Sequence, residues 1–250
     1  MSVYNKRFFD MQSEGSAASA AKVVPTIVDL IEPKTVLDVG CGRGFWCNAF
    51  ENKGVKAYGL DGPWSKDGFQ GPKDQFIAFD VLGSNPPFRP NLPIPKFDLV
   101  TTFEFLEHID PPKAEPIVDL ITSVTDVVVA GASPPGQGGT HAGHHHVNEQ
   151  WPDYWQDLFA KKGFVAFDFL RPIIWNLEGV EPFYIMNPIG YFRGGPSEKV
   201  VAAAEAAALA NLRNPLGLVH PGMFLRKVGL LEAQPTMVAK KFVRGVLGRS

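Results

Sequence analysis

The sequence predicts an α/β fold in which a doubly wound, mostly parallel seven-stranded sheet is followed by a C-terminal helical extension. Two observations predict this fold. Short apolar runs alternate with helix-length segments between residues 36 and 192, as in the repeated βα units of a right-handed parallel sheet. Glycines or acidic residues also follow the first four runs, and ligands of such sheets bind at the carboxyl ends of the strands.

The first predicted elements lead into a glycine-rich turn. Residues 1–14 are polar and predict an N-terminal arm, whereas the apolar spacing of residues 15–31 predicts a helix that Pro25 kinks. This helix either covers a ligand or only packs on the sheet. Residues 36–39 predict a buried strand, and the segment from residue 45 predicts a helix. Gly40, Gly42 and Gly44 therefore form a strand-to-helix turn, whose backbone lacks Cβ atoms and admits a ligand closely.

The remaining elements follow in the order of an alternating sheet. Strands are predicted over residues 55–61, 76–81, 97–102, 127–130 and 164–169, with a seventh, antiparallel strand within residues 183–192 at or near the edge. Helices are predicted over residues 111–123 and 151–162, and five prolines between residues 83 and 96 predict a surface loop. We expect one domain over residues 15–195. Residues 196–250 form the extension, with a helix over residues 198–212 and then a basic tail, which is either a solvated helix or a contact for an acidic surface.

Composition limits the classes of function. A net charge of -2 gives no global reason to expect a nucleic-acid partner. The two cysteines, Cys41 and Cys47, suit free thiols in a reducing compartment better than a disulfide. The first residues lack the apolar core of a signal peptide, and no run has the length of a membrane span. We therefore expect a cytoplasmic location.

Acidic residues near the predicted strand ends suggest what the glycine turn holds. Asp38 lies two residues before Gly40, where its carboxylate can accept from an ammonium group. Asp61 follows Gly40 by 21 residues, the spacing at which an acid accepts from the ribose hydroxyls of an adenosine ligand; the alternative is an ordinary turn aspartate. The dinucleotide-binding fingerprint would place a third glycine at residue 45, where this chain has Phe45.

The stretch from Val36 to Gly44 resembles motif I of the class I S-adenosylmethionine (SAM) dependent methyltransferases. The resemblance implies a Rossmann-like methyltransferase fold with SAM as cofactor. It also implies that the third strand tip meets the adenine, with Asp80 accepting from the exocyclic amine and Val81 donating its backbone N–H. The cofactor-binding residues that we predict are Asp38, Gly40, Cys41, Gly42, Gly44, Asp61, Asp80, Val81, Phe103 and Glu104.

A second group of residues predicts a metal site. Glu104, Glu107 and His108 have the spacing i, i+3 and i+4, so a helix that begins at the fourth strand tip would direct them the same way. Carboxylates with an imidazole suit Mg²⁺, Mn²⁺ or Fe²⁺. Alternatively, Glu104 only orients backbone near the cofactor and His108 is an ordinary polar residue.

The segment also resembles the E-x-x-E-H segment of metal-dependent O-methyltransferases, including the small-RNA 3′-terminal 2′-O-methyltransferases and the ubiquinone O-methyltransferases. In the RNA group a later histidine completes the metal site, and His146 matches that position. The asparagine-containing segment of the RNA enzymes is not reproduced in residues 133–136.

These features together predict methyl transfer to a hydroxyl oxygen of a small molecule, sugar or glycan. The metal would bind the acceptor oxygen, and His144 or His145 would act as the base. Four aromatic residues near or after this loop form either an apolar or sugar-stacking wall or part of the core: Trp151, Tyr154, Trp155 and Trp175.

Three other functions stay open at this point. An RNA-end 2′-O-methyltransferase would need the basic tail to bind RNA, given the net charge of -2. An NAD-dependent oxidoreductase shares the sheet and the acid at position 61 but requires the missing third glycine. A non-enzymatic SAM-binding scaffold would leave the histidine loop inert. The sequence does not determine the oligomeric state.

Overall fold

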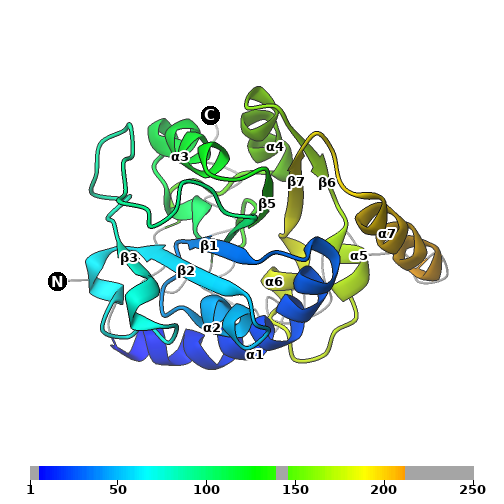
Figure 1. The fold of residues 1–250 in the computed structure, drawn as a ribbon, viewed down its shortest axis with the longest axis horizontal. Coiled ribbons are helices and arrows are strands. Elements are labelled where there is room, and N and C mark those ends of the chain that lie inside the picture. Colours follow the sequence, from blue (N-terminus) through cyan, green and yellow to red (C-terminus); the bar gives the residue numbers. More distant parts are fainter. Residues whose placement is uncertain (1–5, 139–145, 212–250) are drawn as a thin grey trace, which may run out of the picture.

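The computed structural model describes residues 6–138 and 146–211, and the arrangement of these residues is a sheet between two layers of helices (Figure 1). The strands are β1 (Thr35–Val39), β2 (Lys56–Asp61), β3 (Phe76–Ala78), β4 (Leu99–Phe103), β5 (Val127–Gly131), β6 (Phe164–Phe167) and β7 (Ile189–Arg193). The helices are α1 (Lys6–Ile31), α2 (Phe45–Glu51), α3 (Pro111–Ser123), α4 (Pro152–Lys161), α5 (Leu170–Ile174), α6 (Pro182–Met186) and α7 (Glu198–Asn211).

The seven strands form one mixed sheet in the order β3-β2-β1-β4-β5-β7-β6, which confirms the predicted fold class. The first five strands pair in parallel, and β7 runs antiparallel to both β5 and β6. The chain order reverses between β1 and β4, so the β1–β4 crevice is the switch point at which such sheets bind ligands. The carboxyl ends of the parallel strands all lie at one edge of the sheet.

Strands β1 and β4 are covered on both faces, as their apolar sequences predict. Each residue of β4 is buried, and in β1 only the first residue is half-buried. Strands buried on both faces need apolar residues at consecutive positions, which explains the Val-Leu-rich runs without alternation. The buried polar residues of this pair, Asp38, Thr101 and Thr102, are therefore exceptions, and the carboxyl group of Asp38 is the one that most needs a partner.

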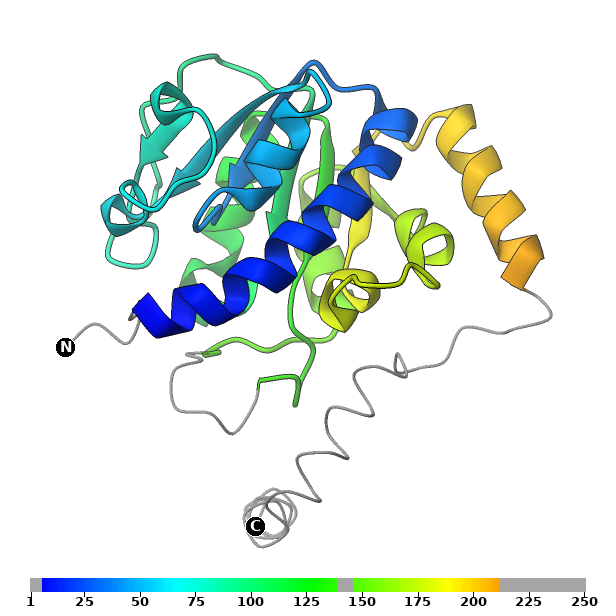
Figure 2. The same cartoon turned by 90° about the horizontal axis from the view of Figure 1, so that it is seen from below.

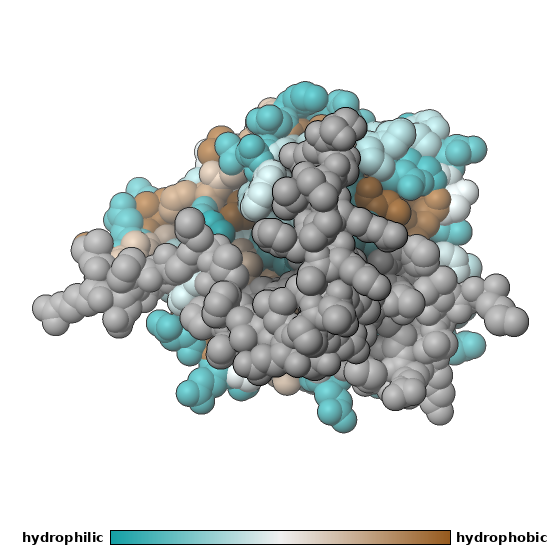
Figure 3. All heavy atoms as spheres, turned by 180° about the vertical axis from the view of Figure 1, so that it is seen from behind, coloured by the Kyte–Doolittle hydropathy of each residue, from teal (hydrophilic) through white to brown (hydrophobic). Residues whose placement is uncertain are grey.

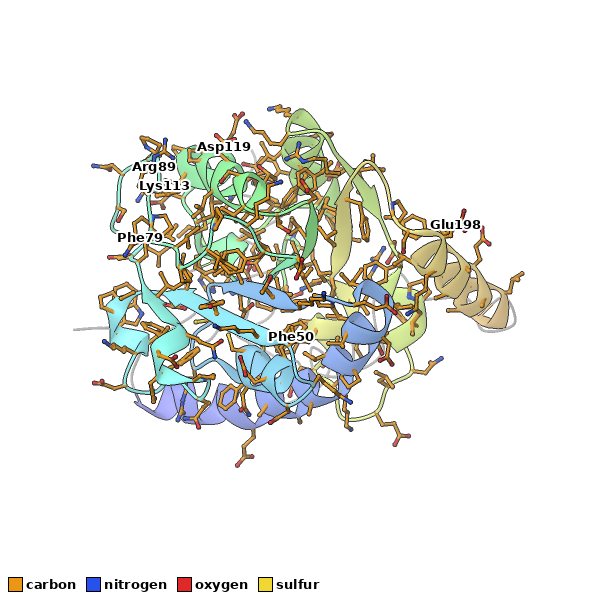
Figure 4. The ribbon with its side chains drawn as sticks, in the orientation of Figure 1. Phe50, Phe79, Arg89, Lys113, Asp119 and Glu198 are labelled. Atoms are coloured by element: carbon orange, nitrogen blue, oxygen red, sulfur yellow. The ribbon has the colours of Figure 1, made fainter. Side chains whose placement is uncertain are left out.

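Two apolar clusters hold the helices against the sheet. One cluster joins α1, α2, α5, α6 and α7 to one face and includes Phe50, which lies between α2 and the sheet (Figure 4). The second cluster joins α3 and α4 to the other face and includes Ile117 and Phe159. Figure 2 shows α1 running across the first face, and in Figure 1 this helix lies on the opposite side of the sheet from α3 and α4.

Several elements differ from the sequence-based expectations. Helix α1 begins at Lys6 and continues through Pro25, so residues 6–14 are helical rather than a separate arm. Strand β3 ends at Ala78 and not at residue 81. The antiparallel strand predicted within residues 183–192, at or near the edge, is β7, which is next to the edge strand β6; the first part of that range belongs to α6.

On the face that Figure 3 shows, hydrophilic and hydrophobic regions lie next to one another. Among the described residues the large exposed apolar side chains are Trp64, Val147, Trp151, Val165, Leu177 and Leu209. None of the helices in the described ranges combines the length and apolar character that a membrane crossing requires. The predicted basic tail lies outside the described residues, and the predicted domain boundaries at residues 14 and 195 stay predictions.

The C-terminal end of α1 gives a test of the fold. Glu32 follows the helix with φ of 53°, in the left-handed region that favours glycine. We expect Glu32→Gly to be more stable than Glu32→Ala by about 1 kcal/mol, because a Cβ is strained there. At Glu205, an exposed residue in the interior of α7, the order should reverse by about the same amount, since glycine weakens a helix interior. Urea unfolding of the four variants measures the glycine–alanine difference in stability at each position. If the alanine variant is the more stable one at both positions, the positive φ of Glu32 is contradicted.

Candidate functional site

The glycine turn after β1 has the conformation that its sequence predicts. Gly40, Gly42 and Gly44 have φ values of 75°, 52° and 72°. A Cβ atom at Gly40 would overlap the ring of Phe105, so this glycine is required for packing. At Gly42 no atom of the described residues lies within 4 Å of the corresponding Cβ position. The turn is therefore accessible to a ligand at Gly42.

Asp61 at the end of β2 connects that strand to the glycine turn. Its carboxylate accepts hydrogen bonds from the backbone N–H groups of Gly42 (2.7 Å) and Gly62 (2.6 Å) and from the Ser65 hydroxyl (3.1 Å). Burial raises the pKa of Asp61, and these three hydrogen bonds oppose the shift. A carboxylate has about four acceptor positions, so one is left for a ligand. Asp61 therefore stabilises the turn, and its carboxylate can still accept a hydrogen bond from a ribose hydroxyl.

Asp38 is almost completely buried beneath the turn, with 2% of its surface exposed. The Thr101 hydroxyl of β4 donates to its Oδ1 atom over 2.7 Å, and the Cys47 thiol lies 4.0 Å from Oδ2. Burial raises the pKa of Asp38 to about 7, although the Thr101 hydrogen bond opposes the shift. The sequence singled out Asp38 but not Thr101, whose role depends on the register between β1 and β4.

The other predicted cofactor residues have structural roles that the sequence did not indicate. Asp80 lies beyond the end of β3 and accepts from the backbone N–H of Gly83 over 2.7 Å. The ring of Phe103 stacks on Trp46 with a centroid distance of 4.0 Å and belongs to the core. Cys41 and Val81 are buried as well. Their contribution to cofactor binding stays a prediction.

Glu104 lies directly after β4 in a conformation that the sequence did not predict. Its φ is 54°, and the following turn over Leu106–His108 is a single 3-10 turn rather than an α-helix. The prediction that a regular helix directs Glu104, Glu107 and His108 the same way is therefore wrong. The two carboxylates nevertheless meet, because the Ser133 hydroxyl lies 3.1 Å from Glu104 Oε2 and 2.8 Å from Glu107 Oε1.

A network of side-chain amides holds the Glu104 carboxylate. Asn187, between α6 and β7, donates to Glu104 Oε1 over 2.6 Å, and Gln137 donates to Oε2. Asn187 also donates to the Gln137 side-chain oxygen over 3.0 Å. These residues come from three separate segments, and neither Asn187 nor Gln137 was predicted. Glu104 is therefore held by protein donors on both oxygens.

Glu107, His108 and His146 form a cluster with metal-ligand chemistry. One ligand atom from each lies within 4.8 Å of the others. His146 Nε2 is 3.9 Å from Glu107 Oε1, and the rings of His108 and His146 are perpendicular with centroids 4.9 Å apart. The Glu107 Oε2 atom is buried and has no hydrogen-bond partner within the described residues. A buried carboxylate oxygen without a protein partner is costly unless a ligand or solvent supplies one.

The structure therefore brings together only some of the four predicted metal ligands. Glu107, His108 and His146 converge, whereas Glu104 lies outside the cluster and is linked to it through Ser133. The Glu107 carbonyl accepts from the backbone N–H groups of Val147 (3.0 Å) and Asn148 (2.9 Å), which fixes the segment after His146 next to β4. The predicted bases, His144 and His145, lie outside the described residues.

Comparison with known proteins supports the fold. A family model described as a methyltransferase domain matches residues 12–116. A candidate O-methyltransferase from Nostoc punctiforme superposes with a TM-score of 0.54 at 17% identity, covering 74% of this chain and 59% of that one. The mitomycin 7-O-methyltransferase MmcR superposes with a TM-score of 0.50 at 15% identity, covering 75% of this chain and 56% of that one.

A third structure was determined with SAM bound. Magnesium protoporphyrin IX methyltransferase from Synechocystis gives a TM-score of 0.50 at 16% identity, covering 76% of this chain and 85% of that one. The chain has the α/β Rossmann-like fold of methyltransferases. It spans only 59% and 56% of the first two structures. A search of the curated proteins found no match.

In this methyltransferase fold, the buried carboxyl groups at the sheet edge are unusually basic. Burial raises the pKa of Glu104 to about 7, despite the hydrogen bonds from Asn187, Ser133 and Gln137. Burial and the nearby Glu104 raise the pKa of Glu107 well above its ordinary value. Titratable groups with such shifts often mark functional sites, because function retains charges that folding alone would exclude.

A cavity elsewhere in the methyltransferase fold is not part of this site. It has a volume of about 550 Å³ and is lined by residues that include Val28, Lys34, Val55 and Lys199. Lys34 and Val55 directly precede β1 and β2, so the cavity lies at the amino ends of the strands, opposite the glycine turn. It is wide open to solvent and separate from the carboxylates described above.

The raised pKa of Asp38 gives a prediction for stability. Its carboxyl group has a pKa of about 7 in the folded protein and about 4 when unfolded, so between these values the folded state binds more protons. Stability should therefore fall as the pH rises from about 5.5 to about 8. We expect the protein to melt at a lower temperature at the higher pH. The Asp38→Asn variant should show a smaller difference in melting temperature between the two pH values.

A second aspartate provides the control for this measurement. The pKa of Asp98 is lowered, since the backbone N–H groups of Thr35 and Lys34 donate to its carboxylate and outweigh the opposing effect of burial. Its contribution to stability is therefore lost only below about pH 4, outside the tested window. Asp98→Asn should leave the pH difference in melting temperature unchanged. An equal difference in wild type and Asp38→Asn would contradict the account of Asp38.

Proposed function

We propose that the protein is a SAM-dependent O-methyltransferase that methylates a hydroxyl group of a small molecule, sugar or glycan with the help of a divalent metal ion. The observation that carries this proposal is the cluster of Glu107, His108 and His146 at the same sheet edge as the glycine turn. Because β1 and β4 are adjacent, a cofactor on the turn and an acceptor at the cluster would be neighbours.

The residues at the glycine turn fit SAM. Gly42 leaves open space at the turn, Asp61 retains acceptor capacity for ribose hydroxyls, and Asp38 supplies a carboxylate for an ammonium group. SAM supplies a methyl group that its sulfonium already activates. The main tasks of the protein are then to align the acceptor oxygen and to remove its proton. The two buried, free cysteines support a reducing location, and we place the protein in the cytoplasm.

The cluster fits a hard or intermediate divalent cation. One carboxylate and two imidazoles suit Mg²⁺, Mn²⁺ or Fe²⁺, and the buried, unpartnered Glu107 Oε2 provides an acceptor for such an ion. Glu107, His108 and His146 would hold it, with Glu104 acting through Ser133. A bound cation would favour the ionised form of an acceptor hydroxyl. We keep His144 or His145 as the proposed base, because imidazole accepts protons near neutral pH.

The acceptor is proposed from the surface next to this cluster. Trp151 follows His146 by five residues, and 61% of the residue's surface is exposed. An exposed indole face beside a catalytic site suits stacking against a sugar ring. Trp155, in contrast, is buried and belongs to the core. Two of the similar structures, those from Nostoc punctiforme and MmcR, are named as O-methyltransferases, which supports oxygen as the acceptor atom.

Cofactor binding is tested by calorimetry with S-adenosylhomocysteine. We expect binding by wild type and a loss of about tenfold or more in Asp61→Ala, because a ribose hydrogen bond to a charged acceptor contributes about 1.5–3 kcal/mol. Asp74→Ala, which removes an exposed acid, should bind like wild type. Equal affinity in Asp61→Ala, with its melting temperature retained, would show that the ribose is held elsewhere. Binding of NADH instead of S-adenosylhomocysteine would support an oxidoreductase.

Metal binding is tested separately with Mn²⁺ on the chelator-treated protein. We expect Glu107→Gln to abolish Mn²⁺ binding in electron paramagnetic resonance titrations, because it removes the only carboxylate of the cluster. Glu104→Gln should retain measurable binding, since that carboxylate is engaged by Asn187 and Gln137. No Mn²⁺ binding by wild type would remove the metal from the proposal. Equal losses in both variants would instead make Glu104 a direct ligand.

A further inference from the structure

Trp64 is exposed although its side chain packs in a defined place. The residue lies in the 3-10 turn Pro63–Ser65 that follows β2, and 53% of its surface is exposed. A Cβ atom at Gly62 would overlap the six-membered ring of Trp64, so the indole lies directly on the Gly62 backbone. Gly62 has a φ of -58°, which any residue adopts. The glycine is therefore required for the close approach of the ring and not for the backbone conformation.

The turn that carries Trp64 is fixed to Asp61. The Ser65 hydroxyl donates to the Asp61 carboxylate over 3.1 Å, and the Ser65 backbone N–H donates to the Gly62 carbonyl over 3.0 Å. Pro63, the first residue of the turn, restricts its backbone further. The position of the indole is therefore set relative to the carboxylate that we propose for the ribose.

The end of β3 brings a residue predicted to contact adenine close to the same carboxylate. Strands β2 and β3 pair in parallel, and the Phe79 backbone N–H donates to the Asp61 carbonyl over 2.8 Å. Asp80, the predicted acceptor for the exocyclic amine, follows Phe79 directly. Because the base of adenosine is bonded to its ribose, a ribose held by Asp61 places the base next to the segments that follow β2 and β3. A carboxylate contacts the edge of a base, whereas its face suits an aromatic ring.

We propose that the indole of Trp64 stacks on the adenine ring of the cofactor, and that Gly62 makes room for the indole in this position. The proposal rests on the SAM binding proposed above and adds a residue that contacts the face of the base. It accounts for an exposed indole at the end of β2, because the bound base would cover the ring that the described structure leaves accessible.

Calorimetry with S-adenosylhomocysteine measures the contribution of the ring. Trp64→Ala should lose about 5-fold to 150-fold in affinity, the range that stacking of a base on an aromatic side chain supplies. Trp64→Phe keeps an aromatic face and should lose less. Leu209→Ala, which removes an exposed apolar side chain from α7, should bind like wild type. Equal affinity in Trp64→Ala and wild type would overturn the stacking alone, whereas no binding by wild type would overturn SAM binding itself.

Gly62→Ala tests the position of the indole without removing it. The added Cβ would displace the ring, so we expect a loss of affinity that the single variant shows and that disappears once Trp64 is alanine. Gly68→Ala is the matched control and should bind like wild type, because the nearest atoms lie 3.6 Å or more from its added Cβ. If Gly62→Ala causes the same loss with and without the indole, its assigned role is overturned.

Tryptophan fluorescence separates stacking from a structural role of Trp64. Stacked adenine should quench the emission of this indole, so the decrease at saturating S-adenosylhomocysteine should be smaller in Trp64→Phe, which still binds, than in wild type. Leu209→Ala should show the decrease of wild type. An equal decrease in wild type and Trp64→Phe would overturn the proposal.

Discussion

The parallel pairing of β1 with β2 and β4 is the constraint on which the whole site depends. It places the ends of these strands at one edge, so that the glycine turn, Asp61 and Glu104 become neighbours despite their separation in sequence. The same register sets Asp38 opposite Thr101, whose hydroxyl is its principal partner. A shift of one residue would turn these side chains to the other face of the sheet and separate them.

The site retains buried acids whose ionisation the apolar surroundings oppose. Asp38 and Glu104 have pKa values of about 7, and the pKa of Glu107 is also raised, in each case mainly by burial. A fold under selection for stability alone would replace such groups by apolar ones. A cation would reduce the free-energy cost of ionising these buried groups, whether it is an ammonium group at Asp38 or a metal at Glu107. Ligand binding and stability are therefore coupled in this structure.

Local patterns predicted the elements and the glycine turn, because apolar runs and positive-φ glycines are properties of short segments. Two five-residue helices, α5 and α6, were missed, since such lengths show no helical period. The prediction of a regular helix at Glu104 was wrong, because the positive φ of this residue is incompatible with a right-handed helix that begins directly after β4. Ser133, Gln137 and Asn187 were not found as site residues: they approach the acids only through long-range packing, which no spacing in the sequence encodes.

The most direct test of the account is a crystal structure with S-adenosylhomocysteine and Mn²⁺, with anomalous scattering used to locate the metal. The account predicts adenosyl density at the glycine turn with its ribose at Asp61, and an anomalous peak bonded to Glu107, His108 and His146 at the same edge of the sheet. Ligand density at the amino ends of the strands, or a turn that stays empty at saturating ligand, would contradict it.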